Sequence, residues 1–430
     1  MHYFSTKGRA AVVGFREAVL KGQPEDGGLY FPSQIPDLSE LANSVWSPGS
    51  EAETALRLMR PYVAGEIPED ALHAICDEAI DFPFPLVEIR PGVFVLELFH
   101  GPTLAFKDVG ARFMSRCLGY FSSSIGKRTV VIVATSGDTG GAVAHGFAGV
   151  EGVSVVILFP KGRVSRVQEL QLTRTDTNVI TLEVQGSFDD CQKLAKTALA
   201  DNNLREKYFL TSANSINIAR WLPQQTYYFT ARRQMPDAKI VFSVPSGNFG
   251  NIAAGLIAQR AGLGANSFIA ACNANNVVSK YLESGQYVPE HSKTTLSNAM
   301  DVGDPSNLAR IRRLFSDDLE LIRQNMATVS ISDEETAATI RKVNGEFGYT
   351  MDPHTAVGYA SLEKLAKPGP EEVGVVLATA HPVKFDSVAD ILSNYIEVPD
   401  SVARLGERQR RSVEIGNSYS EMIDAINRSL

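Results

Sequence analysis

Hydrophobic runs and helical spacing alternate along the middle of the chain. Two runs, 129–134 and 153–159, are almost entirely apolar, as strands buried on both faces of a sheet require. Further strands are predicted at 93–98, 178–184, 209–211, 239–245, 268–271 and 374–379. Helical patterns follow several strands, and Ser187 is placed to cap a helix over 188–201. The alternation predicts an α/β fold, and its two series of strands predict two open, parallel-rich sheets around one cleft.

The two ends of the chain show a different pattern. Residues 1–90 are predicted to be mostly helical, with helices over 51–59 and 68–80. Two prolines, Pro83 and Pro85, then interrupt the chain and place a boundary near residue 90. The tail from 401 to 430 is polar and is also predicted to be helical.

Composition and charge narrow the possible partners and the location. The 430 residues include 41 Lys and Arg against 49 Asp and Glu, which gives a net charge of −8. The chain also has no block of basic residues, so nucleic acid is not expected as a binding partner. No apolar run is long enough to span a bilayer, and residues 1–7 show no signal-peptide pattern. The four cysteines have no paired spacing, which argues against disulfides and a metal site. We therefore expect a cytoplasmic protein without a membrane partner, and both a monomer and a dimer remain open.

The stretch from Phe99 to Asp108 carries the first candidate for chemistry. It follows the strand at 93–98, and Lys107 stands among apolar neighbours where a helix begins. Burial favours a neutral amine, and a neutral amine is a nucleophile toward a carbonyl carbon. A lysine that extends from a helix start to solvent is the alternative, and the rest of the chain must decide between them.

Three further turns follow predicted strands, where open α/β sheets bind ligands. The turn at 134–141 offers hydroxyl and backbone N–H groups for a carboxylate or phosphate, and the turn at 244–251 places two glycines before a helix. The latter lacks the Gly-Lys-Ser/Thr ending of a Walker loop. The third turn, 378–385, ends a strand with a small polar residue. Each could alone be an ordinary turn.

A second anion site is suggested between these turns. Asn214 and Arg220 could both point into a cleft, where the guanidinium would bind two phosphate oxygens, although Arg220 on a solvated helix face is the alternative. Taken together, the isolated lysine, the hydroxyl-rich loop, the glycine-asparagine loop and the final polar group indicate a pyridoxal-phosphate site.

The motifs resemble those of threonine synthases of the bacterial and fungal type. The resemblance rests on 99–108, 135–141, 245–250 and 379–385, is supported by 26–32, 212–218 and 296–302, and covers nearly the whole chain in the same order. It implies the tryptophan-synthase β-like fold of fold type II enzymes and pyridoxal 5′-phosphate as cofactor. It also implies the conversion of O-phospho-L-homoserine and water to L-threonine and phosphate.

The resemblance implies roles for individual residues and a division into domains. Lys107 matches the Schiff-base lysine and the catalytic base. The loop around the cofactor phosphate matches Gly247, Asn248, Phe249, Gly250 and Asn251, and Thr379 matches the residue that faces the ring nitrogen. The substrate carboxylate is assigned to Thr135, Ser136, Gly137 and Thr139, and the substrate phosphate to Asn214, Ser215 and Arg220. The expected domains are an N-terminal mostly helical domain (1–90), a large cofactor-binding domain (91–112 and 212–400), a small mobile domain (113–211) and a C-terminal helical tail (401–430).

Asp138 departs from the pattern of related fold type II enzymes. Many of them have Asn beside the ring hydroxyl, and a charged Asp would repel a phenolate oxygen there. The ionisation of Asp138 is therefore left open by the sequence.

Several other functions compete with this interpretation. The nearest are an O-phosphohomoserine phospholyase that stops at 2-oxobutyrate and a serine/threonine dehydratase; Arg220 and the two-phosphate arrangement favour a phosphorylated substrate over free serine. A non-catalytic phosphate- or nucleotide-binding protein would have no use for Lys107 as a nucleophile. A scaffold protein gains no support, because the chain has no internal repeat.

Overall fold

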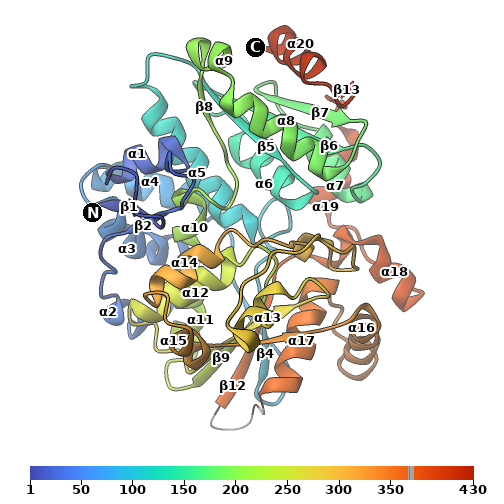
Figure 1. Cartoon of the computed structure of the whole chain (residues 1–430). Coiled ribbons are helices and arrows are strands. Elements are labelled where there is room, and N and C mark those ends of the chain that lie inside the picture. Colours follow the sequence, from blue (N-terminus) through green and yellow to red (C-terminus); the bar gives the residue numbers. More distant parts are fainter. Residues whose placement is uncertain (367, 369–371) are drawn as a thin grey trace.

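Two separate sheets organise the molecule in this computed structural model, which describes residues 1–366, 368 and 372–430. The larger sheet has the strand order β11-β10-β9-β12-β4-β3 and is parallel except for the antiparallel edge strand β3. Its strands are β3 (Leu86–Arg90), β4 (Val93–Glu97), β9 (Lys239–Pro245), β10 (Ser267–Cys272), β11 (Met326–Ser330) and β12 (Glu372–Ala378). Figure 1 shows this sheet in the lower half of the molecule.

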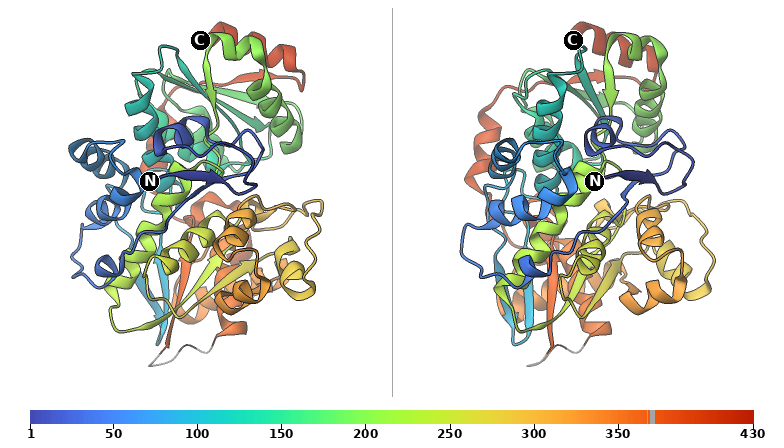
Figure 2. Two further views of the ribbon diagram at one scale, coloured as in Figure 1. Left: turned by 60° about the vertical axis from the view of Figure 1, so that its left-hand side comes forward. Right: turned by 90° about the vertical axis from the view of Figure 1, so that its left-hand side faces the viewer.

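The smaller sheet occupies the other half and is parallel throughout, in the order β13-β7-β6-β5-β8. Its strands are β5 (Thr129–Ala134), β6 (Val153–Pro160), β7 (Val179–Val184), β8 (Phe209–Thr211) and β13 (Val413–Ile415). A short antiparallel pair, β1 (Tyr3–Ser5) and β2 (Tyr30–Pro32), belongs to the N-terminal segment. Both views in Figure 2 keep the two larger sheets in separate halves.

Helices connect and cover the strands. In the N-terminal third they are α1 (Phe15–Lys21), α2 (Ser39–Ala42), α3 (Glu51–Val63), α4 (Glu69–Ala79), α5 (Lys107–Ser122) and α6 (Asp138–Phe147). The middle of the chain forms α7 (Arg166–Thr173), α8 (Phe188–Ala200), α9 (Asn202–Lys207), α10 (Ile218–Trp221), η1 (Leu222–Gln224), α11 (Gln225–Gln234), α12 (Gly250–Arg260) and α13 (Val277–Ser284). The remainder are η2 (Asn298–Met300), α14 (Leu308–Leu314), α15 (Leu319–Asn325), α16 (Asp333–Phe347), α17 (Pro353–Leu365), η3 (Pro382–Lys384), α18 (Asp386–Leu392), α19 (Asp400–Glu407) and α20 (Tyr419–Ser429).

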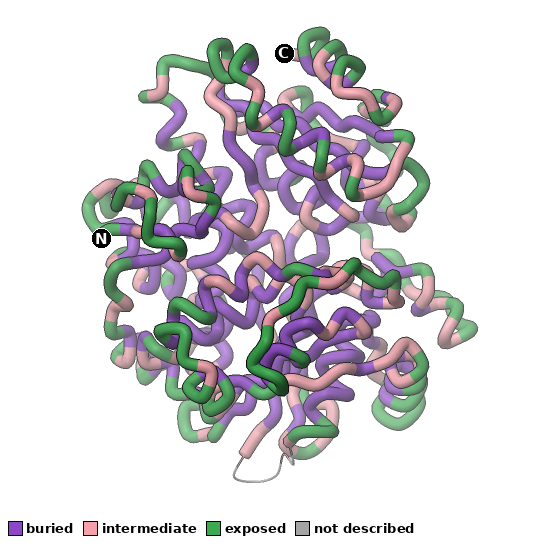
Figure 3. Tube along the Cα trace, in the orientation of Figure 1, coloured by how far each residue is buried: buried purple, intermediate pink, exposed green. Residues whose placement is uncertain are grey.

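The apolar strands are explained by burial on both faces. In β5, Val131 and Val133 belong to the hydrophobic core shared with α5 and α6, whereas Val130 and Ile132 pack in the cluster with α8. In β9 the same alternation sends Phe242 toward α11 and α12 and Val241 toward α17. Figure 3 shows buried segments through the middle of both halves. The prediction of two parallel-rich sheets flanked by helices is confirmed.

The ends of the chain contain strands that the sequence analysis did not predict. The N-terminal segment is mostly helical, but it also pairs β1 with β2. The tail contributes β13 to the smaller sheet, and α20 packs on α8, so residues 413–429 are joined to that sheet. These strands are three residues long, too short to show a period, and unlike β8 they lie outside the alternation of strands and helices that indicated the others. The division of the chain at 90, 112 and 211 stays a prediction. Within the described residues, no helix is long and apolar enough to cross a membrane.

Candidate active site

A cavity of about 810 Å³ lies where the carboxyl ends of β5, β8, β9 and β12 lead into loops. It collects the predicted site residues from five separate stretches of the chain. They are Lys107, Thr135, Ser136, Asp138, Thr139, Asn214, Ser215, Arg220, Gly247, Asn248, Phe249, Gly250, Asn251 and Thr379. Of the predicted set, only Gly137 is missing from the described lining residues.

Lys107 is the first residue of α5, and its side chain is 17 % exposed. The Phe106 N–H donates to the Thr379 carbonyl at 2.9 Å, which holds the start of α5 beside the end of β12. Burial lowers the pKa of Lys107, and the charges of Lys384 and Arg220 lower it further, against the opposing effect of Asp138. The environment therefore favours the neutral, nucleophilic amine.

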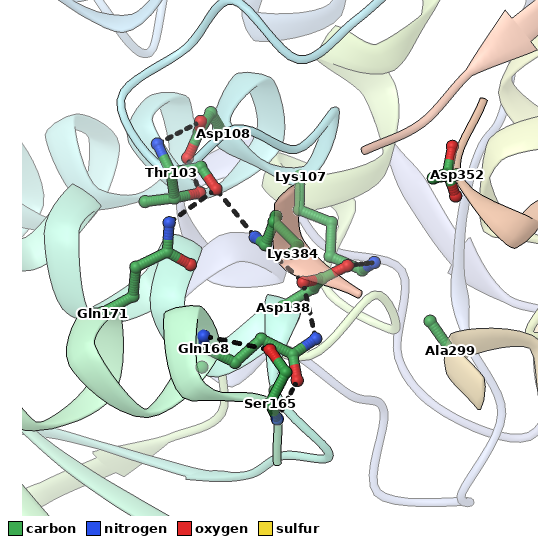
Figure 4. Close-up of polar contacts among 12 residues, drawn as sticks. Thr103, Lys107, Asp108, Asp138, Ser165, Gln168, Gln171, Ala299, Asp352 and Lys384 are labelled. Carbon is green, nitrogen blue, oxygen red and sulfur yellow. Dashed lines mark hydrogen bonds and ion pairs between the residues drawn. The ribbon is translucent and has the colours of Figure 1, made fainter. Parts of the chain in front are cut away.

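Asp138 begins α6 and meets two lysines (Figure 4). Its Oδ1 accepts hydrogen bonds from Lys384 Nζ at 2.9 Å and Gln168 Nε2 at 3.0 Å, and its Oδ2 lies 3.6 Å from Lys107 Nζ. Burial alone would raise the pKa of Asp138, but the charges of Lys384 and Lys107 outweigh burial and hold this pKa well below its usual range. Asp138 is therefore ionised, and it is paired.

Lys384 is a site residue that sequence reasoning missed. Its side chain is completely buried in η3, and its Nζ also donates to the Thr103 carbonyl at 2.7 Å. The signal was present, because Lys384 stands between Val383 and Phe385, among apolar neighbours as Lys107 does. Nothing in the sequence placed it against Asp138, which begins α6 beside the smaller sheet.

The hydroxyl-rich turn before α6 is held in its conformation partly by its own side chains. Thr135 Oγ1 accepts hydrogen bonds from the N–H groups of Gly137 at 3.0 Å and Gly140 at 2.8 Å. Gly137 has a φ of 140°, and a Cβ there would lie 2.4 Å from the Gln168 side chain, so only glycine fits. The hydroxyls of Ser136 and Thr139 are left as the better candidates for contacting a carboxylate in the cavity.

The loop after β9 is built for a close approach of an anion. Gly247 lies against η2, where an added Cβ would be 2.5 Å from the Met300 Cα. Asn251 Oδ1 accepts hydrogen bonds from the Tyr227 hydroxyl at 2.7 Å and the Tyr228 hydroxyl at 2.8 Å. Its Nδ2 is buried in the cavity wall without a partner in the described structure. An unused donor in the first turn of α12 fits a bound phosphate.

A histidine holds η2 against that loop. The Ala299 N–H donates to His354 Nε2 at 3.1 Å, and His354 Nδ1 lies 2.7 Å from Asp352 Oδ1. Both ring nitrogens are therefore used, although His354 lines the cavity. Sequence reasoning missed this residue, because its position against Ala299 depends on the tertiary packing of α17.

Asn248 joins the two predicted anion sites. Its Nδ2 donates to Ser215 Oγ at 2.7 Å, and its Oδ1 accepts from the N–H of Ser306 at 2.8 Å and its hydroxyl at 2.9 Å. Because Ser215 Oγ accepts from Asn248 and, at 3.3 Å, from Asn307 Nδ2, its own proton is free to be donated. Ser215 therefore presents a donor to the cavity.

Arg220 is buried, which rules out the solvated helix face. It is 2 % exposed; one guanidinium nitrogen donates to the Ala213 carbonyl, and Nε has no partner in the described structure. Burial lowers its pKa to about 10, so the side chain remains charged at neutral pH. A guanidinium with an unused N–H beside Ser215 suits a phosphate group.

A second buried guanidinium, that of Arg310, holds the loop that contains Ser215. It donates to the Ser215 carbonyl at 2.9 Å and to Asn307 Oδ1 at 2.7 Å, and it stacks 4.3 Å from the centre of the Trp221 ring. Sequence reasoning missed Arg310, because the arginines at 310, 312 and 313 give no sign of which one is buried.

The residues present fit pyridoxal phosphate. Lys107 supplies a mostly enclosed amine with a lowered pKa for the aldehyde, and the unpartnered Asn251 amide at the start of α12 supplies a donor for the phosphate. Thr379 follows β12 on the cavity wall and supplies an uncharged hydroxyl group. Within the described residues, no group of three or more His, Cys, Asp or Glu side chains is arranged to hold a metal ion.

Comparisons with known proteins agree with this site. Residues 82–380 match the family of pyridoxal-phosphate dependent enzymes, 2–80 match the threonine synthase N terminus, and 355–426 match the threonine synthase C-terminal family. The chain is 41 % identical over 429 residues to a threonine synthase of Haemophilus influenzae, with 98 % of each chain covered. It is 40 % identical over 407 residues to that of Escherichia coli, with 94 % of each covered.

Solved structures extend the agreement to the fold. A pyridoxal-phosphate-bound threonine synthase from Brucella melitensis superposes with a TM-score of 0.94 at 37 % identity, covering 100 % of this chain and 99 % of that one. The Escherichia coli enzyme gives 0.90 at 38 % identity, with both chains fully covered. Maize serine racemase, at 15 % identity and a TM-score of 0.55 over 84 % of this chain, shares the fold alone. The chain therefore belongs to the threonine synthase family of pyridoxal-phosphate-dependent, fold type II enzymes.

Proposed function

We propose that this chain is a lyase that converts O-phospho-L-homoserine and water to L-threonine and phosphate, with pyridoxal 5′-phosphate as cofactor. The observation that carries the proposal is Lys107, only 17 % exposed, in a cavity that contains two separate sets of anion-binding donors. One set surrounds Asn251, and the other surrounds Arg220 and Ser215. Two phosphate sites suit a phosphorylated cofactor together with a phosphorylated substrate.

Residues of the chain are assigned to the cofactor as follows. Lys107 attaches the aldehyde, the loop 247–251 holds the phosphate, and Thr379 meets the ring nitrogen. When bound, pyridoxal phosphate supplies an aldehyde for amines and a ring that withdraws electrons from the substrate Cα. A threonine hydroxyl does not hold a full positive charge on a ring nitrogen, which limits how far that withdrawal goes.

Lys107 is also the base. Whenever it is not attached to the cofactor, its Nζ in the neutral form would accept the proton from the substrate Cα. Burial lowers the pKa of this amine and so favours its neutral form before that step, and Asp138 helps to stabilise the ammonium that the step creates. A second proton leaves Cβ, phosphate leaves Cγ, and a proton is added at Cγ. Water then adds its hydroxyl group at Cβ, and the return of a proton to Cα completes threonine.

The substrate is bound at both of its ends. Arg220 and the Ser215 hydroxyl donate to its phosphate, with Asn214 beside them, and the Arg220 charge stabilises the departing phosphate. Ser136, Thr139 and the backbone of the turn at 135–139 receive its carboxylate, while Thr135 and Gly137 maintain the shape of that turn. The departed phosphate stays close to Cβ and assists the attacking water.

Water must be excluded before the protons move. We propose that residues 113–211 close over the cavity, with hinges near Gly110 and Ser212. A cytoplasmic location accompanies this proposal, because all four cysteines are buried and free, as a reducing compartment allows. Cell fractionation tests the location.

The function is tested with the purified protein, its absorbance spectrum and O-phospho-L-homoserine as substrate. We expect a visible band from the lysine-bound cofactor, and equal amounts of threonine and phosphate as products. Lys107→Ala should lose both the band and the products, whereas Lys193→Ala, at an exposed position on α8, should keep both.

Other outcomes would redirect the assignment. Phosphate with 2-oxobutyrate in place of threonine would make the chain a phospholyase, and turnover of free serine or threonine alone would make it a dehydratase. Absence of the band after pyridoxal phosphate is added would contradict the role of Lys107.

A further inference from the structure

Lys384 connects the two sheets inside the site. It ends η3, which follows β12 of the larger sheet, and its Nζ lies 2.9 Å from Oδ1 of Asp138 on α6 of the smaller half. The same nitrogen donates to the Thr103 carbonyl at 2.7 Å in the turn before Lys107. The Lys384 side chain is completely buried, and that of Asp138 is 3 % exposed.

The remaining contacts of Asp138 are few. Gln168 Nε2 donates to Oδ1 at 3.0 Å, and Gln168 is itself oriented because its Oε1 accepts from the Ser165 N–H at 3.1 Å. The other carboxylate oxygen faces Lys107 Nζ at 3.6 Å. Asp138 is thus shared between a lysine that is proposed to react and a lysine that no step of the reaction uses.

We propose that Lys384 is a positioning residue whose charge neutralises Asp138 and thereby keeps the neighbouring Lys107 amine free to react with the cofactor aldehyde. The inference rests on the role of Lys107 in the proposed function, and it is independent of which substrate is turned over. It also accounts for an aspartate beside the reacting lysine, because the pair of Asp138 and Lys384 carries no net charge.

The physical reason lies in the charges that face Lys107. They are Asp138 on α6, Lys384 on η3 and Arg220 on α10. Asp108, on α5 itself, faces Lys384 and Arg220. Without Lys384, no second lysine would pair with Asp138, so its negative charge would attract the charged form of Lys107 more strongly. The repulsion between the Lys384 and Lys107 charges would also be lost. Both changes favour the ammonium form, and an opposite charge within about 4–6 Å typically moves a pKa by about 1–3 units.

The test measures capture of pyridoxal phosphate by the cofactor-free protein across neutral to alkaline pH. The rate at which the visible band grows follows the neutral fraction of Lys107, so its midpoint reports the pKa of that amine. The ionisations of free pyridoxal phosphate are the same for every variant and cancel when midpoints are compared. No step of this test requires threonine to be formed.

Four proteins are compared: the unchanged chain, Lys384→Met, Asp138→Asn and the double variant. Lys384→Met should raise the midpoint by about 1–3 units, Asp138→Asn should lower it, and the double variant should return close to the unchanged chain. If Lys384 only packed against its neighbours, the midpoints of the two single variants would not shift in opposite directions.

The inference can be tested even if one of the variants fails to fold. If Lys384→Met leaves too much buried charge to fold, the comparison of Asp138→Asn with the double variant isolates the Lys384 charge. The double variant should then have the higher midpoint, because the repulsion between Lys384 and Lys107 is gone. Equal midpoints in the variants that fold, or shifts of both single variants in one direction, would overturn the inference alone. Failure of the unchanged chain to capture pyridoxal phosphate would overturn the proposed function and the inference with it.

Discussion

At the scale of single residues, the cavity depends on buried cations whose hydrogen bonds are not all used. Arg220 has a free Nε, and its planar guanidinium can bind two oxygens of one phosphate, which a lysine cannot do. One charged hydrogen bond contributes about 1.5–3 kcal/mol, or roughly ten- to a hundredfold in binding. We expect Arg220→Lys to raise the KM for O-phospho-L-homoserine by about that factor. Arg312→Lys, at a half-exposed ion pair with Asp317, is the matched control. An unchanged KM would place the substrate phosphate elsewhere.

The cysteines provide a second prediction at this scale. Burial raises the pKa of Cys76 and Cys191 to about 12 and that of Cys272 to about 11, and it raises the pKa of Cys117 well above its usual value. Since only the thiolate reacts, a thiol reagent at mildly alkaline pH should label none of the four in the native protein. All four should react after unfolding in urea. Fast labelling of the native protein would show that one of these sites opens.

Which site residues could be predicted from sequence depended on whether their surroundings are local. Lys107, Asn251 and Thr379 follow strands in recognisable turns, so their neighbours in sequence indicated their place. Lys384 and Arg310 act through partners more than 90 residues away, Asp138 and Ser215. No short pattern contains both members of such a pair. Whether Asp138 is charged was undecidable for the same reason.

At the scale of elements, the contact between the loop after β9 and η2 sets the shape of the cofactor site. Alanine at position 247 would place a Cβ 2.5 Å from the Met300 backbone, and η2 is held in place by His354. Overpacking of this kind costs about 1–3 kcal/mol. We expect Gly247→Ala to lower the free energy of unfolding by that amount and to weaken pyridoxal-phosphate binding, measured by urea unfolding and absorbance titration.

Gly345 is the control for this prediction. It lies exposed in α16 with nothing within 4 Å of an added Cβ. Gly345→Ala should therefore stabilise the protein by about 0.5–1 kcal/mol, because alanine is the better helix former, and should leave cofactor binding unchanged. If Gly247→Ala behaved like Gly345→Ala, the close contact with η2 would not shape the loop.

Whether a helix or strand could be predicted from the sequence depended on its length and on how far it is buried. The strands buried on both faces, β5 and β6, show continuous apolar runs, and Ser187 marked the start of α8, where the structure has it in a capping box with Asp190. The edge strands β11 and β13 are only partly buried, so they lack such a run. Their place in the sheets is decided by pairing with distant strands, which the local pattern does not contain.

At the scale of the whole molecule, the end of the chain supports a sheet that lies far from it in sequence. Met422 on α20 is completely buried in the cluster formed by β5, β6, β7 and α8. Truncating a buried methionine costs about 2–5 kcal/mol. Met422→Ala should lower the free energy of unfolding by that amount and speed proteolysis within residues 113–211. The exposed Asn427→Ala should do neither. Equal stability of both variants would show that the tail is not part of this half.

The distribution of charge gives the last prediction. The chain carries a net charge of −8, which repels a phosphorylated substrate, yet Arg163 and Lys196 add positive charge at exposed positions on the cavity wall. Lys196→Glu should lower kcat/KM at low ionic strength, because charges near a cleft raise the rate of encounter with an opposite charge. The difference from the unchanged chain should shrink as salt is added, because the Debye length falls to about 8 Å at physiological salt. Lys193→Glu changes the net charge equally on the same helix, but Lys193 is not among the described lining residues, so its effect should be smaller. Equal effects would mean that overall charge governs the encounter. A deficit of Lys196→Glu that persists at high salt would mean that Lys196 contacts the substrate directly.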